Sequence, residues 1–104
     1  MADLDGWRAT CDAAALHDKG RLAVNVQGQP ILLIEQRGTI YALHNRCPHL
    51  GCPLTRGQME DHIIVCPCHD WAFDIRNGEF LHASEIKLLT FETRVASGKV
   101  YIKL

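Results

Sequence analysis

The chain has 104 residues, with 11 basic and 12 acidic side chains and a formal net charge of −1, and neither sign is concentrated in one segment. Proteins that bind nucleic acid need a basic patch, so this composition argues against a nucleic-acid partner. Residues 1–16 carry acidic side chains where a signal peptide would carry basic ones, and no apolar segment reaches membrane length, so we expect a cytoplasmic monomer without a membrane segment.

The segments expected to form secondary structure are short. Residues 12–20 predict one helical turn. Alternating or continuous apolar residues predict β-strands at residues 21–26, 31–35, 39–44, 62–65, 71–75, 79–81, 89–95 and 100–104. Asn77-Gly78 predicts a tight turn between two of these strands, and no linker or repeat divides the chain. The pattern therefore predicts a single domain, residues 1–104, of the antiparallel all-β class.

Five cysteines are present, and in a reducing compartment cysteines serve more often as metal ligands or redox groups than in structural disulfides. Four of them lie in two loops between predicted strands, RCPHLGCPL at residues 46–54 and CPCHDW at residues 66–71. Cys11 lies far from both loops in the sequence, and we expect it to be an ordinary packed side chain. The two loops are therefore the candidate site.

The loops offer the ligand patterns Cys47-x-His49 and Cys66-x-x-His69. Tetrahedral zinc sites usually take ligands at C-x₂₋₄-C or H-x₃₋₅-H spacing. Two side chains that are separated by a single residue are poorly oriented to bind the same small ion. The spacing suits a binuclear cluster better, since Cys47 and Cys66 can hold one metal ion while His49 and His69 reach the other. A structural zinc module is the alternative that this spacing disfavours.

In these loops the sequence CPHLGC followed by CPCH resembles the Rieske family, whose two-iron cluster has two imidazoles in place of two thiolates on one iron. The resemblance extends, through strand order and spacing, over most of residues 20–104. It implies a Rieske-like antiparallel β-sandwich with a two-loop cluster-binding subdomain and one 2Fe-2S cluster per chain. It also implies that Cys47 and Cys66 bind the buried iron and that His49 and His69 bind the outer iron, near solvent.

Cys52 and Cys68 match, position for position, the two cysteines that form a disulfide between the cluster loops in the respiratory branch of the family. Most small Rieske ferredoxins lack this pair. The resemblance implies a buried disulfide that ties the loops together and that burial protects from glutathione. Two alternatives stay open, namely two thiols packed near the cluster and an exposed thiol pair with a regulatory role.

The residues after the second histidine resemble a different branch of the family. In respiratory Rieske proteins a serine and a tyrosine in this stretch donate hydroxyl hydrogen bonds to cluster sulfurs and raise the potential, but this chain has Asp70, Trp71 and Phe73 there. Trp71, Phe73 and Asp74 form a pattern similar to the Rieske domains of ring-hydroxylating oxygenases. Asp70 replaces the usual glycine and adds a negative charge near the outer iron. We therefore expect a potential toward the low end of the roughly −150 to +300 mV range of Rieske centres.

The resemblance implies a one-electron carrier that passes electrons from a reductase to a terminal oxidoreductase. A chain this short has no room for the second domain, with a mononuclear iron site, that a ring-hydroxylating oxygenase needs, so we expect a carrier and not an enzyme. Two alternatives stay open. One is a small Rieske subunit of a larger redox enzyme of the nitrite-reductase type, and the other is a redox or iron sensor that responds through cluster loss or through Cys52 and Cys68.

Overall fold

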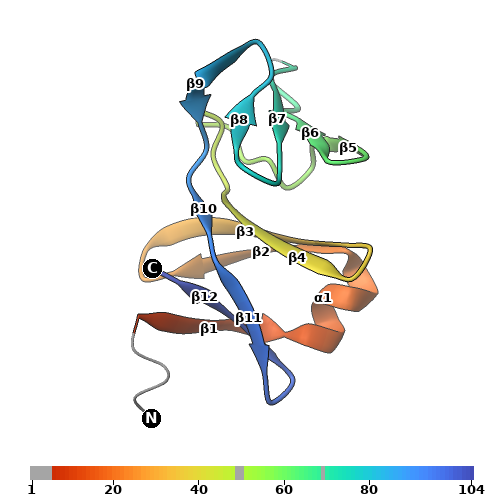
Figure 1. Cartoon of the computed structure of the whole chain (residues 1–104), viewed down its shortest axis with the longest axis vertical. Helices are drawn as coiled ribbons and strands as arrows, with labels where there is room; N and C mark the ends of the chain where they lie inside the picture. Colours follow the sequence, from red (N-terminus) through yellow and green to blue (C-terminus); the bar gives the residue numbers. More distant parts are fainter. Residues whose placement is uncertain (1–5, 49–50, 69) are drawn as a thin grey trace.

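The computed structural model describes residues 6–48, 51–68 and 70–104 (Figure 1). Within these ranges the chain forms one short helix and strands that pair antiparallel throughout. The elements are, in chain order, β1 (Trp7–Asp12), α1 (Ala13–Lys19), β2 (Arg21–Val26), β3 (Gln29–Gln36), β4 (Thr39–His44), β5 (Gln58–Glu60), β6 (Ile63–Val65), β7 (Ala72–Asp74), β8 (Glu79–Phe80), β9 (Ala83–Lys87), β10 (Thr90–Phe91), β11 (Thr93–Ala96) and β12 (Lys99–Lys103). The expected antiparallel all-β class is confirmed.

The strands of the described residues form three sheets, in the orders β1-β12-β11, β10-β4-β3-β2 and β5-β6-β7-β8-β9. We call them sheets A, B and C. Figure 1 shows sheets A and B with α1 at one end of the molecule, which we call the base, and sheet C at the other end, which we call the upper lobe. The chain enters the upper lobe after β4 and returns to the base at β10, which pairs with β4.

Strand β3 lies between two hydrophobic cores. Ile31 and Leu33 pack in the core of the base, together with Val100 and other side chains of sheet A. Leu32 and Ile34, which point to the opposite face of the strand, pack in the core of the upper lobe. A run of four apolar residues is the pattern of a strand covered on both faces, and each of these four is at most 3% exposed.

Both candidate loops lie at the same end of the strands of sheet C. The first loop joins β4 to β5, and the second joins β6 to β7. Gln58, where β5 begins, pairs with Val65, where β6 ends, and Val65 pairs in turn with Ala72, where β7 begins. Since the three positions are aligned across the sheet, the end of the first loop meets both ends of the second.

The predicted strand 89–95 is divided in the structure. Phe91 pairs with Ala42 in sheet B, whereas Thr93 pairs with Ile102 in sheet A, so the chain changes sheets at this point. Strands β1, β5 and β9 were not predicted. Of the residues that the structure describes, none belong to a helix long and apolar enough to cross a membrane.

Candidate metal centre

The first loop turns back on itself around Cys47. The Cys47 amide donates to the carbonyl of Cys52 (2.8 Å), and the Gly51 amide donates to the carbonyl of Cys47 (2.7 Å). Gly51 has a φ of 76°, which lies in the left-handed region that glycine adopts without steric cost. This compact turn leaves the Cys47 residue 1% exposed.

The second loop makes the same two hydrogen bonds around Cys66. The Cys66 amide donates to the carbonyl of Trp71 (2.7 Å), and the Asp70 amide donates to the carbonyl of Cys66 (3.0 Å). Asp70 therefore occupies the position that corresponds to Gly51, and it too has a left-handed backbone, with a φ of 58°. Asp and Asn tolerate this region better than most side chains, which explains how an aspartate can stand where a glycine is usual.

Cys47 and Cys66 share one buried environment. Both belong to the core of the upper lobe, and Cys66 is fully buried. Cys11 packs against the core of the base instead, as the sequence led us to expect of a cysteine outside the site. The structure thus brings together the two cysteines predicted as ligands and keeps Cys11 apart from them.

His49 and His69, the other two predicted ligands, lie outside the described residues. Among the described residues no group of three or more His, Cys, Asp or Glu side chains is placed to hold a metal ion. The assignment of the two histidines as ligands therefore stays a prediction from the sequence. For the cysteines, the donor set fits an iron–sulfur cluster, because two buried sulfurs from two adjoining loops offer the thiolates that hold iron.

The two loops are joined covalently in the structure. A disulfide links Cys52 and Cys68, whose Cα atoms lie 6.5 Å apart. Cys52 is half-buried and Cys68 is exposed, so this bridge lies nearer to the surface than the buried bridge expected from the sequence. The redox state of the pair in the purified protein is a separate prediction.

We expect the Cys52–Cys68 bridge to survive purification. Alkylation of the denatured, chelator-treated protein without reductant should then label three of the five cysteines, Cys11, Cys47 and Cys66. The same protein denatured with reductant is the control and should take five labels. Five labels in freshly prepared protein without reductant would favour the alternative of two packed thiols.

Aromatic side chains fill the space behind the second loop. Trp71 stacks on Phe80 with ring centroids 4.3 Å apart, and Phe73 lies 5.5 Å from Phe80. Phe73 is fully buried, and none of these three side chains carries a hydroxyl group. Trp71 and Phe73 therefore pack with Phe80 in the core of the upper lobe, and their effect on the potential stays a prediction.

Charged groups lie beside the second loop. Arg56 and Asp70 line one hollow of about 320 Å³ next to Cys66. Both side chains are exposed, so solvent screens their fields. Arg56 therefore places a positive charge on the same hollow, and this charge opposes the negative charge of Asp70.

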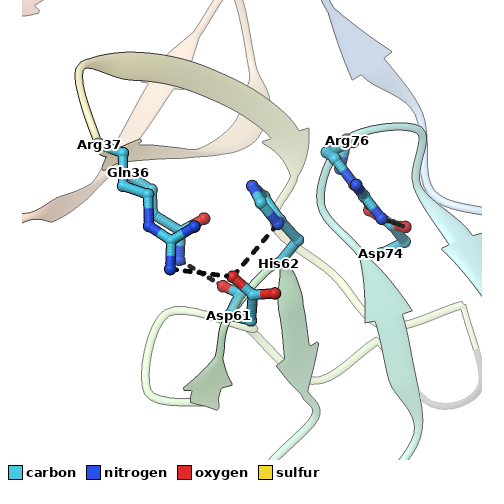
Figure 2. Close-up of polar contacts among 6 residues, drawn as sticks. All are labelled: Gln36, Arg37, Asp61, His62, Asp74 and Arg76. Atoms are coloured by element: carbon cyan, nitrogen blue, oxygen red, sulfur yellow. Dashed lines mark hydrogen bonds and ion pairs between the residues drawn. The ribbon is translucent and has the colours of Figure 1, made fainter.

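Polar side chains connect the upper lobe to the base on the side shown in Figure 2. The side chain of Gln36, at the end of β3, donates to the backbone carbonyl of Asp61, in the turn between β5 and β6. The Asp61 carboxylate lies 3.4 Å from Arg37 and also 3.4 Å from His62. His62 therefore contacts Asp61 at a place away from the two loops.

A second pair in Figure 2 is formed by Asp74 and Arg76. The carboxylate of Asp74 accepts hydrogen bonds from Nη2 (2.8 Å) and Nε (3.0 Å) of Arg76 and from the Arg76 amide (2.9 Å). The hydrogen bonds from the Arg76 side chain are the main reason why the pKa of Asp74 lies below its ordinary value of 3.8.

The lowered pKa of Asp74 predicts a pH-dependent contribution to stability. The pair stabilises the fold while Asp74 is ionised, at pH values above 3.8, and the contribution is lost as the pH falls through the lower pKa of the folded state. Asp74→Asn should lower the free energy of unfolding at pH 7 by about 0.5–1 kcal/mol, a small effect because Arg76 is largely exposed.

Urea unfolding of Asp74→Asn and of the unchanged protein at a series of pH values between 7 and 3 measures this contribution. Glu79→Gln, which removes the exposed pair of Glu79 with Lys87 at 3.5 Å, is the matched control and should have a smaller effect at pH 7. A difference between Asp74→Asn and the unchanged protein that grows toward acid pH would contradict the prediction.

The chain is similar to ferredoxins of known oxygenase systems. It is 33% identical over 97 residues to the ferredoxin component of the naphthalene 1,2-dioxygenase/salicylate 5-hydroxylase systems of Ralstonia sp., covering 89% of this chain and 93% of that protein. It is 28% identical over 93 residues to the ferredoxin component of the alkene monooxygenase system of Xanthobacter autotrophicus, covering 88% and 76%.

The fold of the chain is also similar to that of a solved structure. A chain in the complex of reduced oxygenase and oxidized ferredoxin of carbazole 1,9a-dioxygenase matches with a TM-score of 0.83 at 27% identity, covering 94% of this chain and 93% of that one. This confirms the expected Rieske-like fold. The family model for the Rieske [2Fe-2S] domain matches residues 6–92, a range that contains both loops. The chain therefore belongs to the Rieske [2Fe-2S] domain family.

Proposed function

We propose that this chain is the ferredoxin component of an oxygenase system, taking single electrons from a reductase and delivering them to a terminal oxygenase. The observation that carries this proposal is that the chain matches ferredoxin components over most of both lengths. It is a carrier and not an enzyme, as those relatives are components that supply electrons to a separate oxygenase. A cytoplasmic location is part of the proposal and is tested by cell fractionation.

Four side chains are assigned to the cluster in this proposal. Cys47 and Cys66 hold the iron that lies in the core of the upper lobe, and His49 and His69 hold the iron nearer to solvent. The assignment of the cysteines is supported by their burial in one core. The assignment of the histidines rests on the resemblance of the two loops. When bound, the cluster supplies a centre that gains and loses one electron.

The surrounding side chains support this role by excluding water on the inner side of the cluster. Phe73, Ile64 and Leu54 are fully buried in the same core as the two cysteines. A dry, close-packed wall limits the rearrangement that accompanies the gain of an electron. The outer side, where the histidines are placed by the proposal, is then the side on which a partner docks.

Rapid mixing tests the proposed function. The purified protein, mixed without oxygen with the reductase of a Rieske oxygenase system and one NADH for every two clusters, should accept one electron per cluster, seen as bleaching of its visible absorption. Adding the oxidised terminal oxygenase should restore the absorption. A protein with an intact cluster that neither partner reduces or oxidises above the rate in buffer would contradict the proposal.

Gel filtration separates the carrier from the alternative of an enzyme subunit. A carrier should elute from a native extract as a monomer of 11.7 kDa. Elution only within a larger complex that persists at high salt would favour a small subunit of a larger redox enzyme.

A further inference from the structure

The side chain of Asn45 bridges the two ends of the first loop. Asn45 lies two residues before Cys47 and is 5% exposed. Among the described residues it is the one polar residue that is buried. Its Oδ1 accepts from the amide of Leu54 (2.8 Å), and its Nδ2 donates to Oγ1 of Thr55 (2.7 Å). Its own amide donates to the carbonyl of Pro30 in β3 (2.9 Å). Asn45 therefore ties both ends of the first loop to each other and to sheet B.

Arg21 holds the same part of the loop from the base. From β2 its Nη1 donates to the carbonyl of Thr55 (2.9 Å) and to the carbonyl of Gly57 (2.6 Å). We call residues 54–57 the return limb, because they lead from the first loop into β5. One arginine thus fixes two carbonyl groups of the return limb, although it lies 34 and 36 residues away in the sequence.

The return limb also contacts the second loop. A Cβ atom at Gly57 would overlap the backbone carbonyl of Val65, so the two backbones pass in close contact. Val65 immediately precedes Cys66. At the other end of the limb, the fully buried Leu54 packs in the core that contains Cys47 and Cys66. A shift of the return limb would therefore displace the backbone on both sides of the centre.

We propose that Asn45 and Arg21 are positioning residues for the cluster, which hold the return limb so that Cys47 and Cys66 stay at the separation that the cluster requires. The buried Leu54 amide has its acceptor in Asn45, and a buried amide that loses its acceptor is costly. Without Asn45 the limb moves to find another acceptor, and the sulfur of Cys47 moves with it. The proposal rests on the ligand roles of Cys47 and Cys66 in the proposed function, and not on the identity of the redox partners.

Two pairs of variants separate positioning from general stability. Asn45→Ala removes both side-chain hydrogen bonds, whereas in Asn45→Asp a carboxylate can accept from the Leu54 amide and from the Thr55 hydroxyl, which rotates to donate. Arg21→Met removes the hydrogen bonds to the return limb, whereas Arg21→Lys keeps a donor that can reach it. Thr55→Val is a milder change that removes the acceptor of Asn45 Nδ2 alone.

Matched controls come from residues of the same types in the base. Asn25→Ala removes a side chain that accepts from the Gly28 amide (3.0 Å) in the β2–β3 turn. Arg94→Met removes a guanidinium group that lies 5.6 Å from the ring centroid of Trp7. Neither residue contacts the return limb or the two loops through an interaction of the described residues.

The test measures the rate of cluster loss in excess iron chelator at 20 °C, together with the electron paramagnetic resonance g-values of the reduced cluster and the thermal unfolding midpoint. Asn45→Ala and Arg21→Met should lose the cluster about tenfold faster than the unchanged protein and shift or broaden the g-values. Asn45→Asp and Arg21→Lys should restore most of the retention, and Thr55→Val should lie between. The two controls should match the unchanged protein in the rate of cluster loss and in the g-values.

The inference would be overturned if Asn45→Ala and Arg21→Met unfold at a lower temperature but keep the g-values and lose the cluster within twofold of the unchanged rate. If either variant fails to fold, Thr55→Val and the two conservative variants decide, since unchanged g-values and retention in Thr55→Val would equally reject it. An unchanged protein that never holds a cluster would reject the proposed function instead.

Discussion

Replacing His49 or His69 by alanine is expected to abolish the characteristic visible and paramagnetic resonance spectra of the cluster. The proposed function assigns each histidine as one of two imidazole ligands on one iron, so the loss of either histidine should release that iron and, with it, the rest of the cluster. Removal of an assigned ligand should therefore leave less than about a tenth of the iron of the unchanged chain. Even the loss of a residue that only supports a metal ligand lowers metal affinity by about 10- to 100-fold.

The other histidines provide the controls for this prediction. His62→Ala should leave the spectra nearly intact, because His62 contacts Asp61 and Tyr41 away from the loops. His44→Ala and His82→Ala should do the same, as the ring of His82 packs against Phe80 at the exposed side of the aromatic group. If His62→Ala lost the cluster as completely as His69→Ala, the assigned ligand set would be wrong.

Phe73→Tyr is expected to raise the reduction potential. The respiratory branch of the family has a tyrosine hydroxyl in this stretch, and a donor to a cluster sulfur stabilises the more negative reduced state. If the new hydrogen bond strengthens by about 0.5–1.5 kcal/mol on reduction, the potential of this one-electron centre rises by about 20–60 mV. Protein-film voltammetry measures the shift directly.

The structure makes the Phe73→Tyr prediction sharper than the sequence could. Phe73 is fully buried, so a hydroxyl that finds no partner there would cost about 1–3 kcal/mol of stability. A raised potential with unchanged stability is the predicted outcome, and lowered stability with an unchanged potential is the opposing one. Phe80→Tyr is the matched control, because it adds a hydroxyl to the same aromatic group on a strand that does not adjoin the loops.

The charge beside the second loop can be separated from this hydrogen-bond effect. Asp70→Asn removes the negative charge and keeps a side chain that tolerates the left-handed backbone, so we expect a rise in potential on the order of tens of millivolts. Arg56→Gln should change the potential in the opposite direction, because Arg56 lines the same hollow. Equal shifts of one sign in both variants would show that these charges do not set the potential.

The features that could be predicted from the sequence are those encoded locally. The two loops were found because their cysteines, histidines and prolines follow one another closely, and β3 was found because Ile31 to Ile34 form a continuous apolar run. Strands β2 and β4 have the predicted bounds, and β3 extends the predicted range 31–35 to Gln29–Gln36. Alternation failed for the segment around Phe91, because its two halves belong to different sheets and Leu89 and Val95 are 62% and 52% exposed.

The features that could not be predicted depend on contacts between distant segments. Strand β9 is an edge strand with little burial, so its sequence, ASEIK, carries no clear alternation. Arg21 reads in the sequence as an ordinary charged residue at the start of a strand, and its hydrogen bonds to Thr55 and Gly57 appear only once the loop folds back onto the base. The hydrogen bonds of Asn45 to Leu54 and Thr55 form for the same reason only in the folded loop, although a polar residue at the end of an apolar strand and just before a cysteine is a signal in the sequence.

A two-iron cluster held by the two loops is the feature on which the proposed function depends most directly. Iron, zinc and acid-labile sulfide should be quantified in protein purified without oxygen from an iron-replete host, and the reduced protein should be examined by electron paramagnetic resonance. We predict two irons and two sulfides per chain, together with a paramagnetic resonance signal from the reduced cluster. Stoichiometric zinc without sulfide would contradict the account.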